Sequence, residues 1–155
     1  MKIQSVKHNN RRKAFDVRVS SKTLVFPYGK TDPAPTSEDA VTRVSVDQEL
    51  AREGFTYELQ SGRTGTVHAE QVLEYNQDPH YMRDLLLYKL TLEAQKRLKA
   101  SPLSRREIAR RLGTSAAQLY RLLDQTNYQK SIDQLLSLLQ VLECDVDLVI
   151  RKKTA

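Results

Sequence analysis

The chain has 155 residues, with 25 Lys and Arg against 19 Asp and Glu, a formal net charge of +6, one Cys and no Trp. This composition argues against a disulfide scaffold, a disordered tail and a membrane protein, and it indicates one globular domain or two small ones. The positive balance favours a polyanionic partner without identifying it.

The charge is unevenly distributed along the chain. Residues 1–30 have an excess of seven positive charges, residues 31–80 an excess of seven negative charges, and residues 81–130 an excess of seven positive charges. The first half is therefore neutral, and the basic excess belongs to the second half. We predict two modules, a β-rich partner-binding or dimerisation module over 1–76 and a helical module over 78–155.

Apolar residues alternate with polar ones in the first half, which is typical of half-buried strands. The alternating positions are Phe15, Val17, Val19, Leu24, Phe26, Val44, Val46, Phe55, Tyr57, Leu59 and Val67. Short polar turns between these runs predict two hairpins of an antiparallel sheet, joined by a Pro-rich loop over 28–36.

A helical period begins at Asp78, which is an N-cap candidate followed by Pro79 at the first helical position. The predicted apolar stripe of this helix is Met82, Leu85, Leu86, Leu90, Ala94 and Leu98.

Three further helix starts are indicated by the spacing of a capping box, in which the N-cap side chain and the third helical residue bond each other's backbone N–H. The pairs are Ser104 with Glu107, Ser115 with Gln118, and Ser131 with Gln134.

The chain ends in the alternating segment 145–151, which we predict to be a last β-strand. Its apolar part, 146–150, has two possible partners: the same strand of a symmetry mate, or the N-terminal sheet. Both alternatives are open.

Residues 105–124 place a short helix, a glycine turn and a second short helix within twenty residues. Steeply crossing helices need a small residue at the contact, a turn residue free to take positive φ, and apolar locking residues. The positions that meet these needs are Ile108, Ala109, Leu112, Gly113, Leu119 and Leu122. A plain helical corner with a solvated basic face is the alternative interpretation.

This combination resembles the helix-turn-helix of the Cro/repressor-like (XRE-like) DNA-binding family over roughly 101–149. Together with the alternating first half, the resemblance predicts an α+β chain in which a small antiparallel β-sheet module precedes a four-helix module and a terminal strand. It also implies that helix 116–123 reads the major groove of double-stranded DNA.

Two sets of site residues follow from the resemblance. The expected base readers are Ser115, Ala116, Ala117, Gln118 and Arg121. The expected phosphate contacts are Arg105, Arg106, Arg110, Arg111, Tyr120 and Lys130. Ala116 and Ala117 stand where the family often has polar readers, and Asp124-Gln125 replaces a frequent Asn-Gly.

The interpretation is a cytoplasmic, homodimeric, sequence-specific regulator of transcription that is not an enzyme and needs no metal or cofactor. No catalytic constellation is visible, because His8, His68 and His80 are scattered. The acidic middle of the chain would repel DNA, which favours a protein partner or a second copy for the first module.

Two alternatives stay open. The second half also resembles helix-turn-helix antitoxins, in which case the N-terminal module would bind a toxin, and an RNA-binding factor is the other alternative. The two modules together resemble only an uncharacterised group of bacterial regulator-like proteins.

Overall fold

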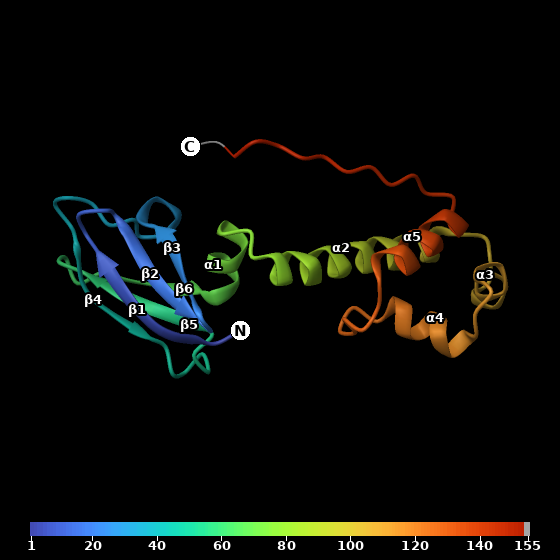
Figure 1. Cartoon of the computed structure of the whole chain (residues 1–155), viewed down its shortest axis with the longest axis horizontal. Helices are drawn as coiled ribbons and strands as arrows, with labels where there is room; N and C mark the ends of the chain where they lie inside the picture. Colours follow the sequence, from blue (N-terminus) through green and yellow to red (C-terminus); the bar gives the residue numbers. More distant parts are fainter. Residues whose placement is uncertain (154–155) are drawn as a thin grey trace. The chain divides into compact units, whose positions relative to one another are not determined.

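The computed structural model describes residues 1–153 as a mixed α+β chain with two three-stranded antiparallel sheets and five α-helices (Figure 1). It divides into two compact units, Met1–Met82 and a second unit that begins at Arg83. The elements of the first unit are β1 (Ile3–Asn9), β2 (Ala14–Val19), β3 (Lys22–Pro27), a single 3₁₀ turn (Tyr28–Lys30), β4 (Val41–Val46), β5 (Gly54–Leu59), β6 (Thr64–His68) and α1 (Ala69–Tyr75). The helix α2 (Pro79–Ala100) follows, and then α3 (Arg105–Leu112), α4 (Ala116–Leu123) and α5 (Ile132–Val141).

The first sheet has the strand order β1-β2-β3. Phe15 lies opposite Phe26, and Val17 lies opposite Val6 and Leu24, so the alternating apolar residues of the three strands share one face. The hairpin β2–β3 agrees with the sequence prediction. Strand β1 was not predicted, because its seven residues IQSVKHN contain only two apolar side chains.

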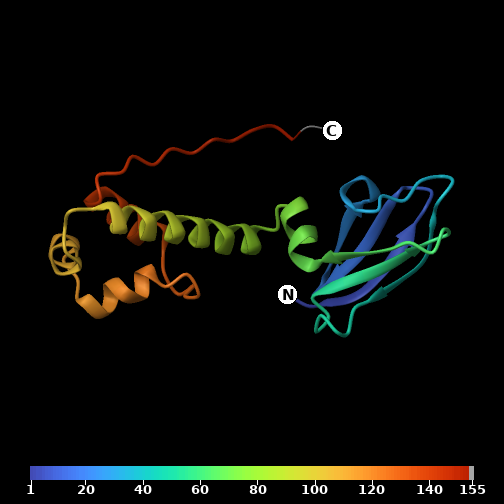
Figure 2. The ribbon, with the colours of Figure 1, turned by 180° about the vertical axis from the view of Figure 1, so that it is seen from behind.

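The second sheet has the strand order β4-β5-β6 and packs its apolar face against that of the first. The ring of Phe15 lies 4.9 Å from that of Phe55 and 5.3 Å from that of Tyr57, measured between centroids. Figure 2 shows the same unit from behind. The predicted hairpins therefore belong to two sheets rather than one.

One glycine of the second sheet is required by a close approach. Tyr57 lies opposite Gly65 across β5 and β6, and a Cβ at Gly65 would stand 2.2 Å from the Tyr57 hydroxyl oxygen. The tyrosine is 1% exposed, and its hydroxyl donates to the carbonyl of Pro33 at 2.7 Å. The bare backbone of Gly65 thus leaves the space that the tyrosine ring fills.

The start of α2 at Pro79 confirms the predicted cap. The Asp78 carboxylate accepts the Tyr81 N–H at 3.1 Å and the ammonium of Lys22 at 3.3 Å. The hydrogen bond from the Tyr81 N–H, aided by Lys22, lowers the pKa of Asp78. The helix α1, which follows β6 directly, was not predicted.

The buried residues of α2 differ from the predicted stripe. They are Leu87, Thr91, Ala94 and Leu98. Ala94 and Leu98 were predicted correctly, whereas Leu86 is 39% exposed. The cause is that residues 85–92 are apolar on more than one side, so periodicity alone did not select the buried side. Thr91 is tolerated inside because its hydroxyl donates to the carbonyl of Leu87 at 2.6 Å.

The remaining helices build the core of the second unit with α2. Ile108 and Ala109 of α3, Leu119 of α4, and Leu138 and Leu139 of α5 are buried in one cluster. No helix among residues 1–153 has the length and apolar character needed to cross a membrane.

The prediction of a terminal strand over 145–151 is wrong for the chain by itself. Within the described residues, neither sheet contains this segment, and Val146, Leu148, Val149 and Ile150 are 50%, 73%, 70% and 86% exposed. A strand exists only where a neighbour completes its hydrogen bonds, and the described chain supplies none here. The alternating pattern therefore showed that this segment could pair as a strand, but not that a partner strand is present.

Candidate nucleic-acid interface

The segment 104–124 forms two short helices joined by a tight turn. The Ser104 hydroxyl accepts the Glu107 N–H at 3.1 Å at the start of α3, and the Ser115 hydroxyl accepts the Gln118 N–H at 3.2 Å at the start of α4. Between them Gly113 takes φ +68°, the left-handed conformation that commonly ends a helix. Local sequence thus determines both helix starts and the turn.

Only one of the three predicted capping boxes is closed. Ser131 accepts the Gln134 N–H at 3.2 Å, and the Gln134 side chain accepts the Ser131 N–H at 2.9 Å. The Glu107 carboxylate instead binds Arg110 and Arg111, because charge-assisted bonds to guanidinium are stronger than a bond to an amide. Gln118 likewise does not return a bond to Ser115, and its side-chain amide is left for other partners.

The residues predicted to hold the two helices together lie where the sequence placed them. Ile108, Ala109 and Leu119 are 0%, 5% and 2% exposed, and Leu112 and Leu122 pack against the same core. The small side chain of Ala109 is buried among apolar residues of the neighbouring helices. The corner between α3 and α4 is therefore a packed structure.

The predicted base readers share the exposed surface of α4. Ser115, Ala116, Ala117, Gln118 and Arg121 are all exposed. Gln118 and Arg121 are three residues apart and so lie on one side of the helix. This side has no acidic residue between Ser115 and Leu123.

Two predicted phosphate contacts form one unit. The guanidinium carbon of Arg105 lies 5.3 Å from the centre of the Tyr120 ring, and Tyr120 is 59% exposed. A guanidinium over an aromatic face is attracted by the ring quadrupole. Tyr120 therefore orients the Arg105 side chain at the edge of the exposed surface of α4.

The other arginines of α3 divide into two classes. Arg110 and Arg111 share the Glu107 carboxylate, with Nε to oxygen distances of 2.8 and 3.0 Å. Hydrogen bonds from Arg110 and then Arg111 lower the pKa of Glu107 to about 2. Arg106, in contrast, has no hydrogen bond or ion pair within the described part of the chain. The three paired residues contribute a single positive charge, so Arg105, Arg106 and Arg121 are the arginines of α3 and α4 whose charge no acid within the described residues balances.

Lys130 does not lie on the surface as a predicted phosphate contact should. It is 7% exposed, and its ammonium donates to the carbonyls of Leu122 and Asp124 at 2.9 and 2.8 Å. Burial lowers its pKa. Its role is to cap the C-terminal end of α4, where carbonyl groups lack helical partners. A lone lysine in a polar loop carries no sequence signal for this role.

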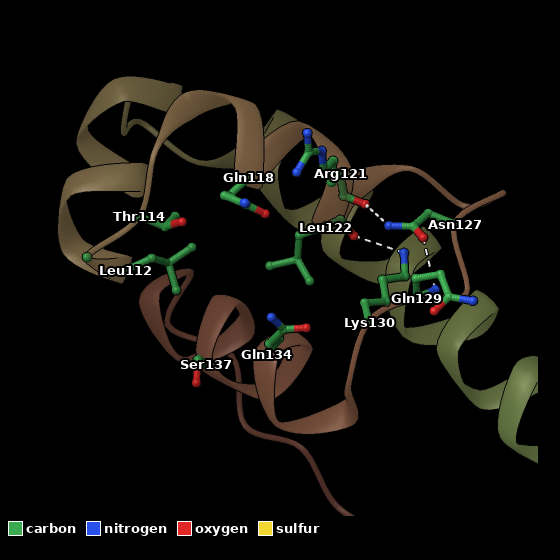
Figure 3. A pocket seen from close by; sticks show the side chains of 11 residues that line it. Leu112, Thr114, Gln118, Arg121, Leu122, Asn127, Gln129, Lys130, Gln134 and Ser137 are labelled. Carbon is green, nitrogen blue, oxygen red and sulfur yellow. Dashed lines mark hydrogen bonds between the residues drawn. The ribbon is translucent and has the colours of Figure 1, made fainter.

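A hollow of about 730 Å³ adjoins the exposed surface of α4 (Figure 3). Gln118 and Arg121 of α4 border it on one side, and Gln134 and Ser137 of α5 border it on the other. Asn127 holds the intervening loop by donating to the carbonyl of Arg121 at 3.1 Å. Sequence reasoning gave Asn127 no role and named Gln134 only as a capping partner, although the run of Asn and Gln residues directly after α4 was a usable signal for Asn127.

The lining of this hollow has four amide side chains and the guanidinium of Arg121, groups that bind phosphate oxygens and base edges. No group of three or more His, Cys, Asp or Glu side chains within residues 1–153 is arranged to hold a metal ion. Comparisons of the chain with protein-family models, curated proteins and solved structures find no match.

Proposed function

We propose that the chain is a transcriptional regulator that binds double-stranded DNA through a helix-turn-helix formed by α3 and α4. The observation that carries this proposal is the exposed surface of α4, which has no acidic residue, includes Arg121 and lies beside Arg105, held over Tyr120. A short helix with such a surface fits the major groove, whose base edges its N-terminal residues can reach.

Each exposed side chain of α4 has a definite chemistry toward DNA. Arg121 can donate two hydrogen bonds to guanine, and Gln118 can pair with adenine because its amide is not consumed by a capping box. The methyl groups of Ala116 and Ala117 suit the thymine methyl. Specificity then rests mainly on Gln118 and Arg121.

Arg105 and Tyr120 have a positioning role in this proposal. Contacts to phosphate fix the register of a protein on the duplex without reading its sequence. An arginine already oriented by an aromatic ring loses less side-chain entropy on binding than a free one.

A homodimer completes the proposal. Proteins of this type read two half-sites one helical turn apart through a two-fold axis. The exposed apolar segment 146–150, which no described strand pairs, supports a role in that dimer.

The test is selection of bound duplexes from a random library, followed by binding measurements at two salt concentrations. Arg121→Ala should cost roughly 1–3 kcal/mol at one base pair and little on random DNA. Arg105→Ala should weaken binding to all duplexes alike and lower the salt slope by about one. The control is Arg97→Ala, which removes an arginine of α2 that is paired with Glu93.

The proposal fails if no sequence is enriched and single-stranded RNA binds as well as duplex DNA. Equal losses on selected and random DNA for Arg121→Ala would remove that residue from the readers. Replacement of Arg105 by Lys keeps the charge and loses the planar stack, which separates the role of Tyr120 from that of charge alone.

A further inference from the structure

The two signs of charge in the first unit are separated along the chain. Residues 1–30, which form the first sheet and its turns, have eight Lys or Arg and one acid. Residues 31–80, which contain the second sheet, have three Lys or Arg and ten acids. The near-zero charge of this half of the chain therefore conceals a basic first sheet and a set of acids that lie mostly in the loops and in α1.

The packing of the two sheets leaves the outer face of the first sheet open to solvent. The apolar faces meet through Phe15, Phe55 and Tyr57, so the remaining face of each sheet points outward, away from the other. Of the ten acids in 31–80, only Glu58 lies on a strand of the second sheet; the others lie in loops, in α1 or at the start of α2, where Asp78 pairs with Lys22. Some are also neutralised, since Glu58 pairs with Arg43 and Asp39 with Arg63.

The outward face of the first sheet carries Lys7 and Arg18. Arg18 lies opposite Ser5 on β1 and Thr23 on β3, and Lys7 lies opposite Asp16. Both cations are exposed, and neither has an ion pair within residues 1–153. Two cations flanked by hydroxyl groups are the donors that phosphate oxygens require.

The turn between β1 and β2 extends the basic surface. Arg11, Arg12 and Lys13 are all exposed there, and Arg12 lies 3.8 Å from Asp16, the one acid of the sheet. The turn is held in shape, because the Asn9 side chain accepts the Arg12 N–H at 3.0 Å.

A second amide anchors the same turn. Asn10 donates to the carbonyl of Val41 at 2.9 Å, accepts the Val41 N–H at 3.2 Å, and accepts the hydroxyl of Tyr28 at 2.8 Å. The cations of the turn therefore stand on a backbone that is ordered before any partner arrives.

We propose that the outward face of the first sheet, with the β1–β2 turn, is a second contact for the phosphate backbone of duplex DNA. The choice of a duplex rests on composition: the outward positions Ser5, Lys7, Asn9, Asp16, Arg18, Thr23 and Val25 include no aromatic residue. Surfaces that bind single strands stack bases on aromatic rings, whereas duplex backbone is bound by charge and hydroxyl donors. This inference rests on the proposed function for the identity of the nucleic acid.

The experiment measures the affinity of the full chain for a random-sequence DNA duplex across a range of salt concentrations. The variant Lys7→Gln/Arg18→Gln should lower the slope of log affinity against log salt by about 2, since each phosphate contact contributes roughly 0.9. The matched control is Arg43→Gln/Arg63→Gln, which removes the same charge from the second sheet. Its slope should stay that of the unmodified chain. Circular dichroism melting establishes that both variants are folded.

The outcomes separate this inference from the proposed function. An unchanged slope for Lys7→Gln/Arg18→Gln, or equal losses in both double variants, overturns the sheet surface even if Arg105→Ala weakens binding. Loss of slope in Lys7→Gln/Arg18→Gln with no effect of Arg105→Ala or Arg121→Ala supports the sheet surface and refutes the helix-turn-helix. Tighter binding of a single-stranded RNA of equal length than of the duplex also overturns the proposal.

Discussion

Replacement of Gly65 by Ala should strongly destabilise the first unit. The added Cβ would stand 2.2 Å from the hydroxyl oxygen of Tyr57 and 2.4 Å from the ring carbon Cζ, where normal contacts exceed 3 Å. The ring has little freedom to withdraw, because it is 1% exposed and packs against Phe15.

The magnitude follows from two contributions. Overpacking of a filled core costs roughly 1–3 kcal/mol, and displacement of the tyrosine breaks its hydroxyl bond to Pro33, which contributes about 1 kcal/mol. We therefore expect Gly65→Ala to lower the free energy of unfolding of this unit by about 2–4 kcal/mol. The control is Gly29→Ala, since a Cβ at Gly29 meets no atom within 4 Å.

The assay is urea unfolding followed by tyrosine fluorescence, which is suitable because the chain has seven Tyr and no Trp. In a chain that already carries Tyr57→Leu, the loss caused by Gly65→Ala should shrink, because the two changes share one contact. A loss below about 0.5 kcal/mol for Gly65→Ala, within the range of ordinary surface substitutions, would refute this account of the sheet. So would an equal loss for Gly29→Ala.

Two further predictions concern the second half of the chain and the start of α2. Gly113→Ala should lower the unfolding free energy by about 1–2 kcal/mol. This loss is the strain of the left-handed backbone alone, since an added Cβ meets no atom within 4 Å. Gly113→Val should cost more, and an unchanged melting temperature for both variants would contradict the turn. The pKa of Asp78 is lowered in the folded state, so its stabilisation is complete above its unfolded pKa of about 3.9 and is lost as the pH falls through the folded value. Asp78→Asn keeps a capping oxygen but removes the charge, so its unfolding free energy should depend less on pH below about pH 4 than that of the unmodified chain. An identical pH dependence in both proteins would show that the charge of Asp78 does not stabilise the fold.

Local signals allowed part of this structure to be predicted. The caps at Asp78, Ser104, Ser115 and Ser131 were correct because an N-cap depends on hydrogen bonds to residues only two or three positions away. The reciprocal half of the box at Ser104 was wrong, because which partner Glu107 chooses depends on competition with nearby arginines.

Features decided by distant partners could not be predicted. Leu87 and Thr91 are buried because of how α2 meets its neighbours, which an apolar period does not reveal when the helix is apolar on several sides. Lys130 was predicted to lie on the surface because lysine is seldom buried. Its burial could not be foreseen, since the carbonyls of Leu122 and Asp124 that bind it belong to the end of α4. The division of the strands into two sheets has the same cause, since strand pairing is a long-range choice.

The separation of charge in the first unit also affects its behaviour before any complex forms. Its eleven basic and eleven acidic side chains leave this body with no net charge, although exposed cations gather on the first sheet and its β1–β2 turn. This basic surface turns toward an approaching polyanion, so the charges act on the rate and orientation of encounter more than on the lifetime of the complex. The same basic surface can attract the exposed acidic loop residues of another copy, such as Asp32, Glu38 and Glu53. Because salt screens this attraction over about 10 Å at 0.1 M, the unit is expected to dissolve better as the ionic strength is raised from a low value.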